Sequence, residues 1–173
     1  MPVINLDDNT AEVSYHEVLD NRVSLLNDNK SSIENYLRSK YVLGSGEYIW
    51  SIHRGHKKKI PSYPVVEVIP SSSAEFPWTG TQAEDKIFGA RVFCSIKNVE
   101  QENKDLFLGY LEGCVRTVLN HPTNLQFDVV RGSKTFAVYD SKCQTVGIGT
   151  LDQGTIYAAE LNWQGKIRII KTF

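Results

Sequence analysis

The fold of this chain is most readily inferred from the stretch Tyr63-Pro64-Val65-Val66-Glu67-Val68-Ile69-Pro70. It is a short apolar run between prolines, which is typical of a β-strand whose first half is irregular or lies at a sheet edge. A second strand is expected at residues 86–98 and an amphipathic helix at 100–120, with short strands following up to the C-terminus. This order predicts an α+β fold in which helices pack on one face of an antiparallel or mixed sheet, within a single domain of residues 1–173.

The second strand and the helix after it are the most clearly patterned elements. Residues 87–96 carry apolar side chains on both strand faces, so this strand is expected in the middle of the sheet. The helix has a polar start and a broad apolar stripe. That stripe consists of Leu106, Phe107, Tyr110, Leu111, Cys114, Val115, Val118 and Leu119. Asn120-His121-Pro122 is expected to end the helix.

The N-terminal region is expected to be helical after a polar start. Residues 1–9 are expected to form an extended arm that is held only if it docks on a neighbour. Asn9 or Thr10 is expected to cap a helix, in which Tyr15, Val18, Leu19, Arg22, Leu25 and Leu26 recur at three- and four-residue spacing. A second helix, or the second half of one bent helix, carries Ile33, Tyr36, Leu37 and Tyr41 on one face and ends at Gly44 and Gly46.

The strongest local charge follows a strand expected at residues 47–53. Arg54, Lys57, Lys58 and Lys59 form a basic turn, which is interpreted as the tip of a hairpin that returns along residues 60–69. One interpretation is a solvated loop whose lysines discourage edge pairing. The other is a finger that meets an acidic partner surface or a DNA backbone.

The C-terminal part of the sequence is rich in strand patterns. Two strands are expected on either side of Arg131-Gly132-Ser133, which predicts a hairpin. Gly147 and Gly149 interrupt the next apolar run and indicate a bend or a close backbone approach. Residues 156–163 and 167–172 are the last expected strands, with Gln164-Gly165 as a bulge or turn between them.

The composition is that of an ordinary globular protein. Hydrophobic residues make up 41% and charged residues 23% of the 173 residues. The formal net charge of -1 argues against bulk attraction to nucleic acid or to an anionic membrane. No apolar stretch approaches the roughly 18 residues that span a bilayer, and the N-terminus lacks the pattern of a signal peptide. An intracellular protein is therefore expected.

Little in the sequence points to catalysis or to metal binding. It contains none of the usual dinucleotide-binding, phosphate-loop, zinc-protease or serine-hydrolase motifs. Cys94 and Cys114 are expected in the core and Cys143 at the surface, and because they form no close pair they predict neither a zinc site nor a redox pair. Glu67 is interpreted as a satisfied structural carboxylate. We therefore expect no enzyme, no metal and no cofactor.

An aromatic loop follows the strand between the prolines. It covers residues 71–81 and contains Phe76 and Trp78. Large apolar side chains in a loop usually pack on something, so these two are expected at a contact with a subunit or another partner. Together with the four basic residues of the turn, they are the predicted interaction residues.

The strand between the prolines resembles the "YPavvv.P" strand of the tail terminator and tail-completion proteins of tailed bacteriophages. The later elements are similar in order: a strand at residues 89–96, a helix at 106–119 that ends in Asn120-His121-Pro122, and a closing strand at 158–163. The similarity covers most of residues 10–170 and rests on order and pattern.

This resemblance implies a homo-oligomeric ring, commonly hexameric, that caps the finished tail tube and presents a docking face to the head. The implied partners are the tail tube protein, a neck or head-completion protein and DNA passing through the ring lumen. The implied location is the virion, after assembly in the host cytoplasm, and no cofactor is implied. The alternatives are a head-completion or stopper protein of the connector, and a small nucleic-acid-binding module that stacks bases on Tyr48 and Trp50 beside the basic turn.

Overall fold

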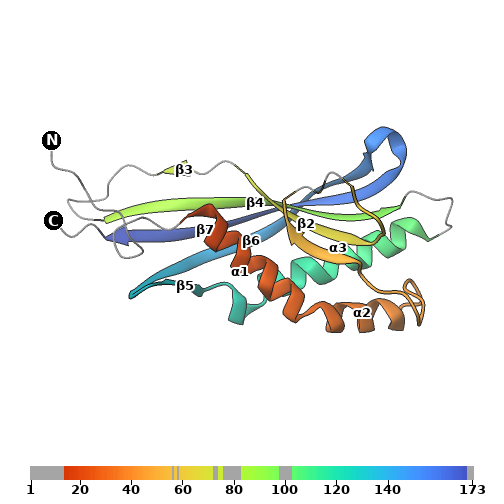
Figure 1. Cartoon of the computed structure of the whole chain (residues 1–173), viewed down its shortest axis with the longest axis horizontal. Coiled ribbons are helices and arrows are strands. Elements are labelled where there is room, and N and C mark those ends of the chain that lie inside the picture. Colours follow the sequence, from red (N-terminus) through yellow and green to blue (C-terminus); the bar gives the residue numbers. More distant parts are fainter. Residues whose placement is uncertain are drawn as a thin grey trace.

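The chain starts with two helices, and a third helix interrupts the strands that follow. We describe a computed structural model (Figure 1) that defines residues 14–55, 57, 59–71, 74–75, 83–97 and 103–170. Within these residues the elements are α1 (Tyr15–Asp28), α2 (Lys30–Ser39), β1 (Ser51–Arg54), β2 (Val65–Pro70), β3 (Ala74–Glu75), β4 (Ala83–Lys97), α3 (Lys104–Asn120), η1 (Pro122–Asn124), β5 (Phe127–Arg131), β6 (Lys134–Leu151), η2 (Asp152–Gly154) and β7 (Ile156–Ile170). The α-helices lie along one side of the sheet, which confirms the predicted α+β fold.

The described strands form one seven-stranded sheet in the order β1-β2-β4-β7-β6-β5, with β3 paired to β4 beside this path. β4 and β7 pair antiparallel from Ala83 opposite Ile170 to Lys97 opposite Ile156. β4 therefore lies in the middle of the sheet, as predicted. β1 and β2 are parallel, whereas the other neighbouring pairs on the path are antiparallel, so the sheet is mixed.

The core lies between the helices and one face of the sheet. Its β4 members are the alternating residues Phe88, Ala90, Val92, Cys94 and Ile96, all of them buried. The apolar residues that α3 buries against the sheet are Phe107, Leu108, Leu111, Val115 and Leu119. The predicted stripe is therefore confirmed at its centre but not at its edges: Leu106 is exposed, and Leu108 is fully buried. Helical spacing alone does not show where the covered face ends.

α1 begins at Tyr15, with Ser14 as its N-cap, rather than after Asn9 or Thr10. The backbone N–H of Ser14 donates to the Glu17 carboxylate at 2.6 Å, which completes a capping box. The predicted inner face of α1 is confirmed at Val18, Leu19, Arg22 and Leu26, which are buried. The sequence does contain a signal for this helix start, because a serine followed three residues later by a glutamate is the pattern of a capping box.

Arg22 is a buried cation in this otherwise apolar layer. Its guanidinium lies 3.5 Å from the centre of the Phe127 ring and donates to the Asn124 carbonyl at 3.0 Å and to the Asn21 side chain at 2.7 Å. Burial lowers the pKa of Arg22 to about 10, so the side chain stays charged at neutral pH. These contacts tie α1 to the start of β5.

Two predictions about α2 and one about the basic turn are wrong. The helix ends at Ser39, with Lys40 as its C-cap, rather than at Gly44 and Gly46. Tyr36 and Tyr41 are exposed, so the inner face of α2 consists of Ile33 and Leu37 without them. β1 and β2 pair in parallel, with Ser51 opposite Val65, so the basic turn is not a hairpin tip. A parallel neighbour requires a connection that crosses back along the sheet, and residues 55–64 supply it. A polar turn between two apolar runs does not reveal the direction of the second strand.

The hairpin predicted around Arg131-Gly132-Ser133 is confirmed. β5 and β6 pair from Arg131 opposite Lys134 to Phe127 opposite Val138, and Gly132 adopts φ 57° in the turn. β6 then continues far beyond β5 and pairs with β7, so that the two form a long hairpin closed by η2. This hairpin projects at the upper right of Figure 1. Gly147 and Gly149 have open space around them, so no close backbone approach occurs there.

Cys143 is buried, which corrects the expectation that it lies at the surface. It belongs to the core-facing side of β6, and burial raises the pKa of its thiol to about 12. Cys94 is fully buried, as predicted, and Cys114 is partly buried against the core. The polar neighbours of Cys143 in the sequence suggested that it is exposed. They were misleading because adjacent residues of a strand point to opposite faces.

Gly165 is the position of close approach that the glycine pattern did not identify. It lies within β7, opposite Phe88 of β4, and no turn interrupts the strand there. A Cβ atom at Gly165 would lie 2.8 Å from the Trp163 ring and 2.8 Å from Cγ1 of Val138. The absence of a side chain thus makes room for the buried indole.

Leu111→Asp and Val115→Asp are expected to abolish soluble folding. Each places an unpaired charge where the wild-type side chain is fully buried, at a cost of several kcal/mol, about the stability of a small domain. Leu106→Asp makes the same chemical change at an exposed position of α3 and is expected to melt close to wild type. Soluble yield and thermal melting by circular dichroism measure the difference. A well-folded Leu111→Asp variant would contradict the placement of α3.

Gly165→Ala is expected to lower the free energy of unfolding by about 1–3 kcal/mol, the usual cost of overpacking a core. The added methyl group would displace the Trp163 ring or Val138. Gly149→Ala is the matched control, since a Cβ atom there meets nothing within 4 Å. Urea denaturation of the two variants tests the prediction, which fails if their midpoints fall together.

Candidate interaction surfaces

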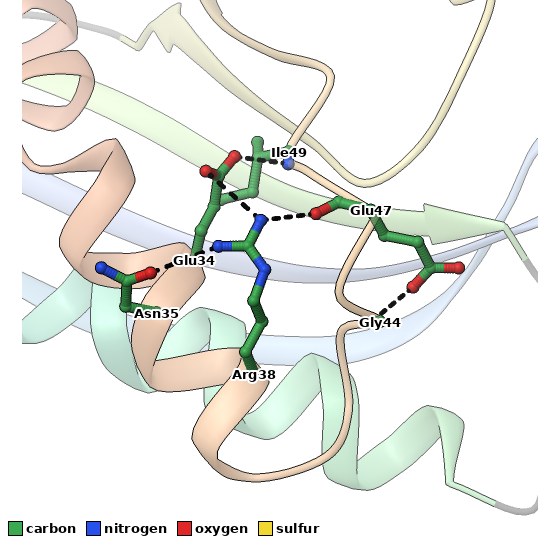
Figure 2. A network of polar contacts seen from close by, with 6 residues as sticks. All are labelled: Glu34, Asn35, Arg38, Gly44, Glu47 and Ile49. Atoms are coloured by element: carbon green, nitrogen blue, oxygen red, sulfur yellow. Dashed lines mark hydrogen bonds and ion pairs between the residues drawn. The ribbon is translucent and has the colours of Figure 1, made fainter.

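Side chains of α2 bond the backbone of the segment that leads into the edge strand β1 (Figure 2). The backbone N–H of Ile49, just before β1, donates to Oε1 of Glu34 at 2.8 Å. Nη2 of Arg38 donates to the carbonyl oxygen of Glu47 at 2.6 Å and lies 3.9 Å from Oε2 of Glu34. The carboxylate and the guanidinium thus take the places of the acceptor and the donor that a neighbouring strand would offer.

The turn that leads into this edge is fixed by the same group of residues. The Glu47 side chain accepts a hydrogen bond from the backbone N–H of Gly44 at 2.8 Å. The Asn35 side chain accepts one from Arg38 Nη1 at 3.3 Å. Further along, the Asn27 side chain of α1 donates to the Ile52 carbonyl at 3.1 Å. Helix side chains therefore satisfy the outer side of residues 47–49 and contact β1.

The opposite edge, along β6, is closed over only part of its length. β5 covers it up to Val138. The backbone and side chain of Ser141 donate to the Leu125 carbonyl at 3.3 Å and 2.9 Å. The side-chain amide of Asn120 bonds both backbone groups of Cys143, at 2.7 Å to its N–H and 2.8 Å to its carbonyl. Beyond Cys143, β7 is the strand partner of β6 within the described residues.

The remaining segment, residues 144–151, is here called the open edge. It reads Gln-Thr-Val-Gly-Ile-Gly-Thr-Leu, has no charged residue, and is exposed at every position. The side chains of Val146, Ile148 and Leu151 are 62%, 53% and 44% exposed. Charged residues and prolines are the usual means of protecting a free edge, and this segment has neither.

The ladder determines which backbone groups of the open edge face outward. The groups of Cys143 point away from β7, because both bond the Asn120 side chain. Alternation along the antiparallel register, with its bulge between Thr145 and Gly147, places the backbone groups of Thr145, Ile148 and Thr150 on the same outward side. The open edge therefore offers three pairs of backbone donors and acceptors to another extended chain.

The face of the sheet away from the helices is polar where the long strands pair. Exposed or partly exposed ion pairs cross between neighbouring strands there, and they join Arg91 to Glu160, Arg168 to Asp85 and Lys166 to Asp140. Such pairs keep a sheet face solvated and contribute little to stability. Among the described parts of the sheet, the open edge is thus a more apolar surface than this face.

The predicted basic turn does not act as one cluster. Nη1 of Arg54 lies 2.8 Å from Oδ1 of Asp20 and is held against α1. Nζ of Lys57 lies 4.8 Å from the centre of the Trp50 ring, within range of a cation–π contact. Lys59 is exposed, and Lys58 lies outside the described residues. Trp50, predicted as a base-stacking residue, therefore already contacts a cation of its own chain.

Glu67 is a satisfied carboxylate, as predicted. It is buried on β2, with Oε1 3.4 Å from Nε2 of His53 and 3.4 Å from the backbone nitrogen of Lys57. These contacts connect neighbouring strands and the segment after β1.

A groove of about 510 Å³ separates α2 from α3. Gly109 and Gly113 line it, and a Cβ atom at either position would meet nothing within 4 Å. At one end the rings of Tyr36 and Tyr110 meet edge to face at 6.0 Å, with Nζ of Lys40 5.3 Å from the Tyr36 ring. The groove has aromatic and small residues but no cluster of titratable groups.

The other predicted interaction residues, Phe76 and Trp78, lie outside the described residues. Across the part of the chain that is described, no group of three or more His, Cys, Asp or Glu side chains could hold a metal ion. Nor does this part contain a helix long and apolar enough to cross a membrane. No protein-family model matches the chain, and no curated protein matches it.

Glu34→Ala is expected to destabilise the protein by about 1–3 kcal/mol, because it leaves the buried Ile49 N–H without an acceptor and Arg38 without its carboxylate. Glu34→Gln keeps an acceptor oxygen and is expected to recover most of the loss. Asn35→Ala, which removes an exposed partner of Arg38, is the control on the same helix. Urea denaturation ranks the three variants. Equal stability of Glu34→Ala and Asn35→Ala would contradict the closure of this edge by α2.

Proposed function

We propose that this protein is a structural subunit of a tailed bacteriophage, which assembles into a ring that caps the tail tube and offers a docking surface to the head. The resemblance of residues 63–70 and of the element order to tail terminators supports the proposal. The α+β fold agrees with that class. The observation that carries the self-assembly part is the difference between the two sheet edges.

A ring needs a head-to-tail contact, in which one surface of a subunit binds a different surface of the next. The edge at residues 47–49 is closed by Glu34 and Arg38, whereas the open edge presents unprotected backbone groups. The uncharged open edge is therefore the better suited of the two to strand pairing with another chain. A subunit whose two sheet edges differ favours head-to-tail assembly, in which each copy binds the next in the same direction, over symmetric pairing of identical edges.

The mechanism of such a ring is geometric and needs no cofactor. Binding to the last ring of the tail tube blocks the addition of further tube subunits. The opposite face of the ring then receives the neck or head-completion protein, and DNA passes through the lumen. A head-completion or stopper protein of the connector would use the same type of ring at a neighbouring place.

The nucleic-acid-binding alternative has less support from the geometry. Two of its four cations, Arg54 and Lys57, have contacts within the chain, and one of the proposed stacking rings, Trp50, is in contact with Lys57. Base stacking requires an accessible aromatic face. Tyr48 is exposed and has Lys30 5.9 Å from its ring centre.

The ring is tested by the mass of the purified full chain in solution and by negative-stain images. A closed oligomer with a central hole is the expected result, and a monomer at every concentration would overturn the proposal. In the phage that encodes the chain, a stop codon in its gene is expected to give tails of uncontrolled length that lack heads. Normal tails attached to heads would exclude the terminator role. Tails of normal length without heads would favour the stopper.

Replacing Lys57, Lys58 and Lys59 together by glutamine is expected to leave folding within about 0.5 kcal/mol of wild type, as for most surface changes. The yield of infectious particles is expected to fall, and the deficit relative to wild type is expected to be largest at low salt, because salt screens the exposed charges of the wild-type lysines over about 8–10 Å. The matched control neutralises Lys40, Lys97 and Lys134, three exposed lysines elsewhere on the chain. If both triple variants assemble particles normally, the basic turn is only a solvated loop.

A further inference from the structure

The open edge of β6 has neither the charged residues of the edge strand β5, Asp128 and Arg131, nor side-chain contacts like those made at residues 47–49. Glu34 and Arg38 close one edge, and β5, Leu125 and Asn120 close the other edge as far as Cys143. The outward backbone groups of Thr145, Ile148 and Thr150 follow, flanked by exposed apolar side chains. A long uncharged edge of this kind is a template for strand addition. Its occupant is therefore an extended chain segment.

The N-terminal segment of a second copy fits this edge in length and composition. Residues 1–13 precede Ser14, the N-cap of α1, and lie outside the described residues. They read Met-Pro-Val-Ile-Asn-Leu-Asp-Asp-Asn-Thr-Ala-Glu-Val. Val3, Ile4 and Leu6 supply apolar and β-branched side chains, and Pro2 precedes them at a position where proline is tolerated in a strand. We propose that residues 3–6 of one copy pair with the open edge of the next.

Charge favours an antiparallel orientation of the added segment. In that orientation its C-terminal end, with Asp7 and Asp8, lies toward the start of the open edge, next to the exposed Lys142. Lys142 is the nearest cation in the sequence to the uncharged run of residues 143–151. Antiparallel addition thus brings opposite charges together, whereas parallel addition carries the two aspartates to the far end, toward Asp152.

The reach of the segment favours a second copy over the same chain. The Tyr15 ring packs on Phe88 at 5.0 Å, and Ile148 lies opposite Ala159, which lies opposite Cys94. Ile148 is thus about 20 Å along the sheet and about 10 Å across it from the start of α1. Residues 7–14 span at most about 26–29 Å when fully extended, so pairing within one chain would need most of that length in a nearly straight path. In Figure 1 the start of α1 and the β6–β7 hairpin lie toward opposite ends of the molecule.

The inference rests on the self-assembly part of the proposed function and names its subunit contact. Two full-length variants test it. The first, Ile4→Pro with Asn5→Pro, removes a backbone donor from the N-terminal segment whichever residue faces β6. The second, Ile148→Pro, removes one outward donor from the open edge while the side of β6 that pairs with β7 keeps its donors. Alanine at the same positions is the matched control, since it shortens the side chains but keeps every N–H.

Each proline variant alone is expected to be monomeric by light scattering, and an equimolar mixture is expected to give a dimer of one copy of each. The intact N-terminal segment of the Ile148→Pro copy then binds the intact open edge of the Ile4→Pro, Asn5→Pro copy. The remaining segment and the remaining edge of this dimer both carry proline, so no further copy can be added. The alanine variants are expected to assemble like wild type, with half-assembly concentrations shifted by less than about tenfold, whereas the proline variants shift by more.

The remaining outcomes distinguish the competing explanations. Self-association of the Ile4→Pro, Asn5→Pro variant would overturn the inference in favour of pairing between two open edges. A mixture that stays monomeric would overturn it in favour of a segment bound within its own chain. A wild-type ring that survives Ile4→Pro with Asn5→Pro would leave the proposed ring standing and remove only this contact. A dimer in the mixture together with a wild-type chain that forms open filaments would support the contact and exclude the ring.

Discussion

The antiparallel ladder between β4 and β7 is the constraint on which the rest of the structure depends. It runs without interruption from Ala83 opposite Ile170 to Lys97 opposite Ile156, and its inner face holds Phe88, the indole of Trp163 and the bare backbone of Gly165. β2 and β6 add to its two sides, and α1 and α3 cover its inner face. Because the ladder is long, β7 and its partner β6 continue together to the hairpin end that η2 closes.

The two sides of the sheet then end in different ways. On the β1 side a carboxylate and a guanidinium on one helical turn, Glu34 and Arg38, supply the acceptor and the donor of a missing strand. On the β6 side the Asn120 amide does the same for Cys143 alone. The helices thus close the sheet where they reach it. α3 reaches the hairpin at Tyr157, where Nζ of Lys104 lies 5.1 Å from the ring, but the outer edge of β6 after Cys143 stays available for a second chain.

The sequence predicted the order of the main elements because their signals are local, although it divided β6 and β7 into two strands each. The apolar alternation of β4, the stripe of α3 and the turn at Gly132 each depend on residues near one another in the chain. The same reasoning failed where the answer depends on distant residues. Cys143 is buried by α3 and the sheet, and the outer sides of Tyr36 and Tyr41 have no covering element in the described chain. The direction of β2 beside β1 follows from the path of residues 55–64.

The pattern of apolar and polar residues was enough to establish an α+β chain with a central strand, a covering helix and no recognisable catalytic motif. The basic turn, the predicted site most visible in the sequence, was identified by composition, yet its Arg54 and Lys57 contact Asp20 and Trp50. The open edge had only a weak signal, an uncharged run with two glycines. An edge is a property of the sheet, since it exists only where no other segment pairs, and that can be known only once every strand, helix and capping side chain has its place.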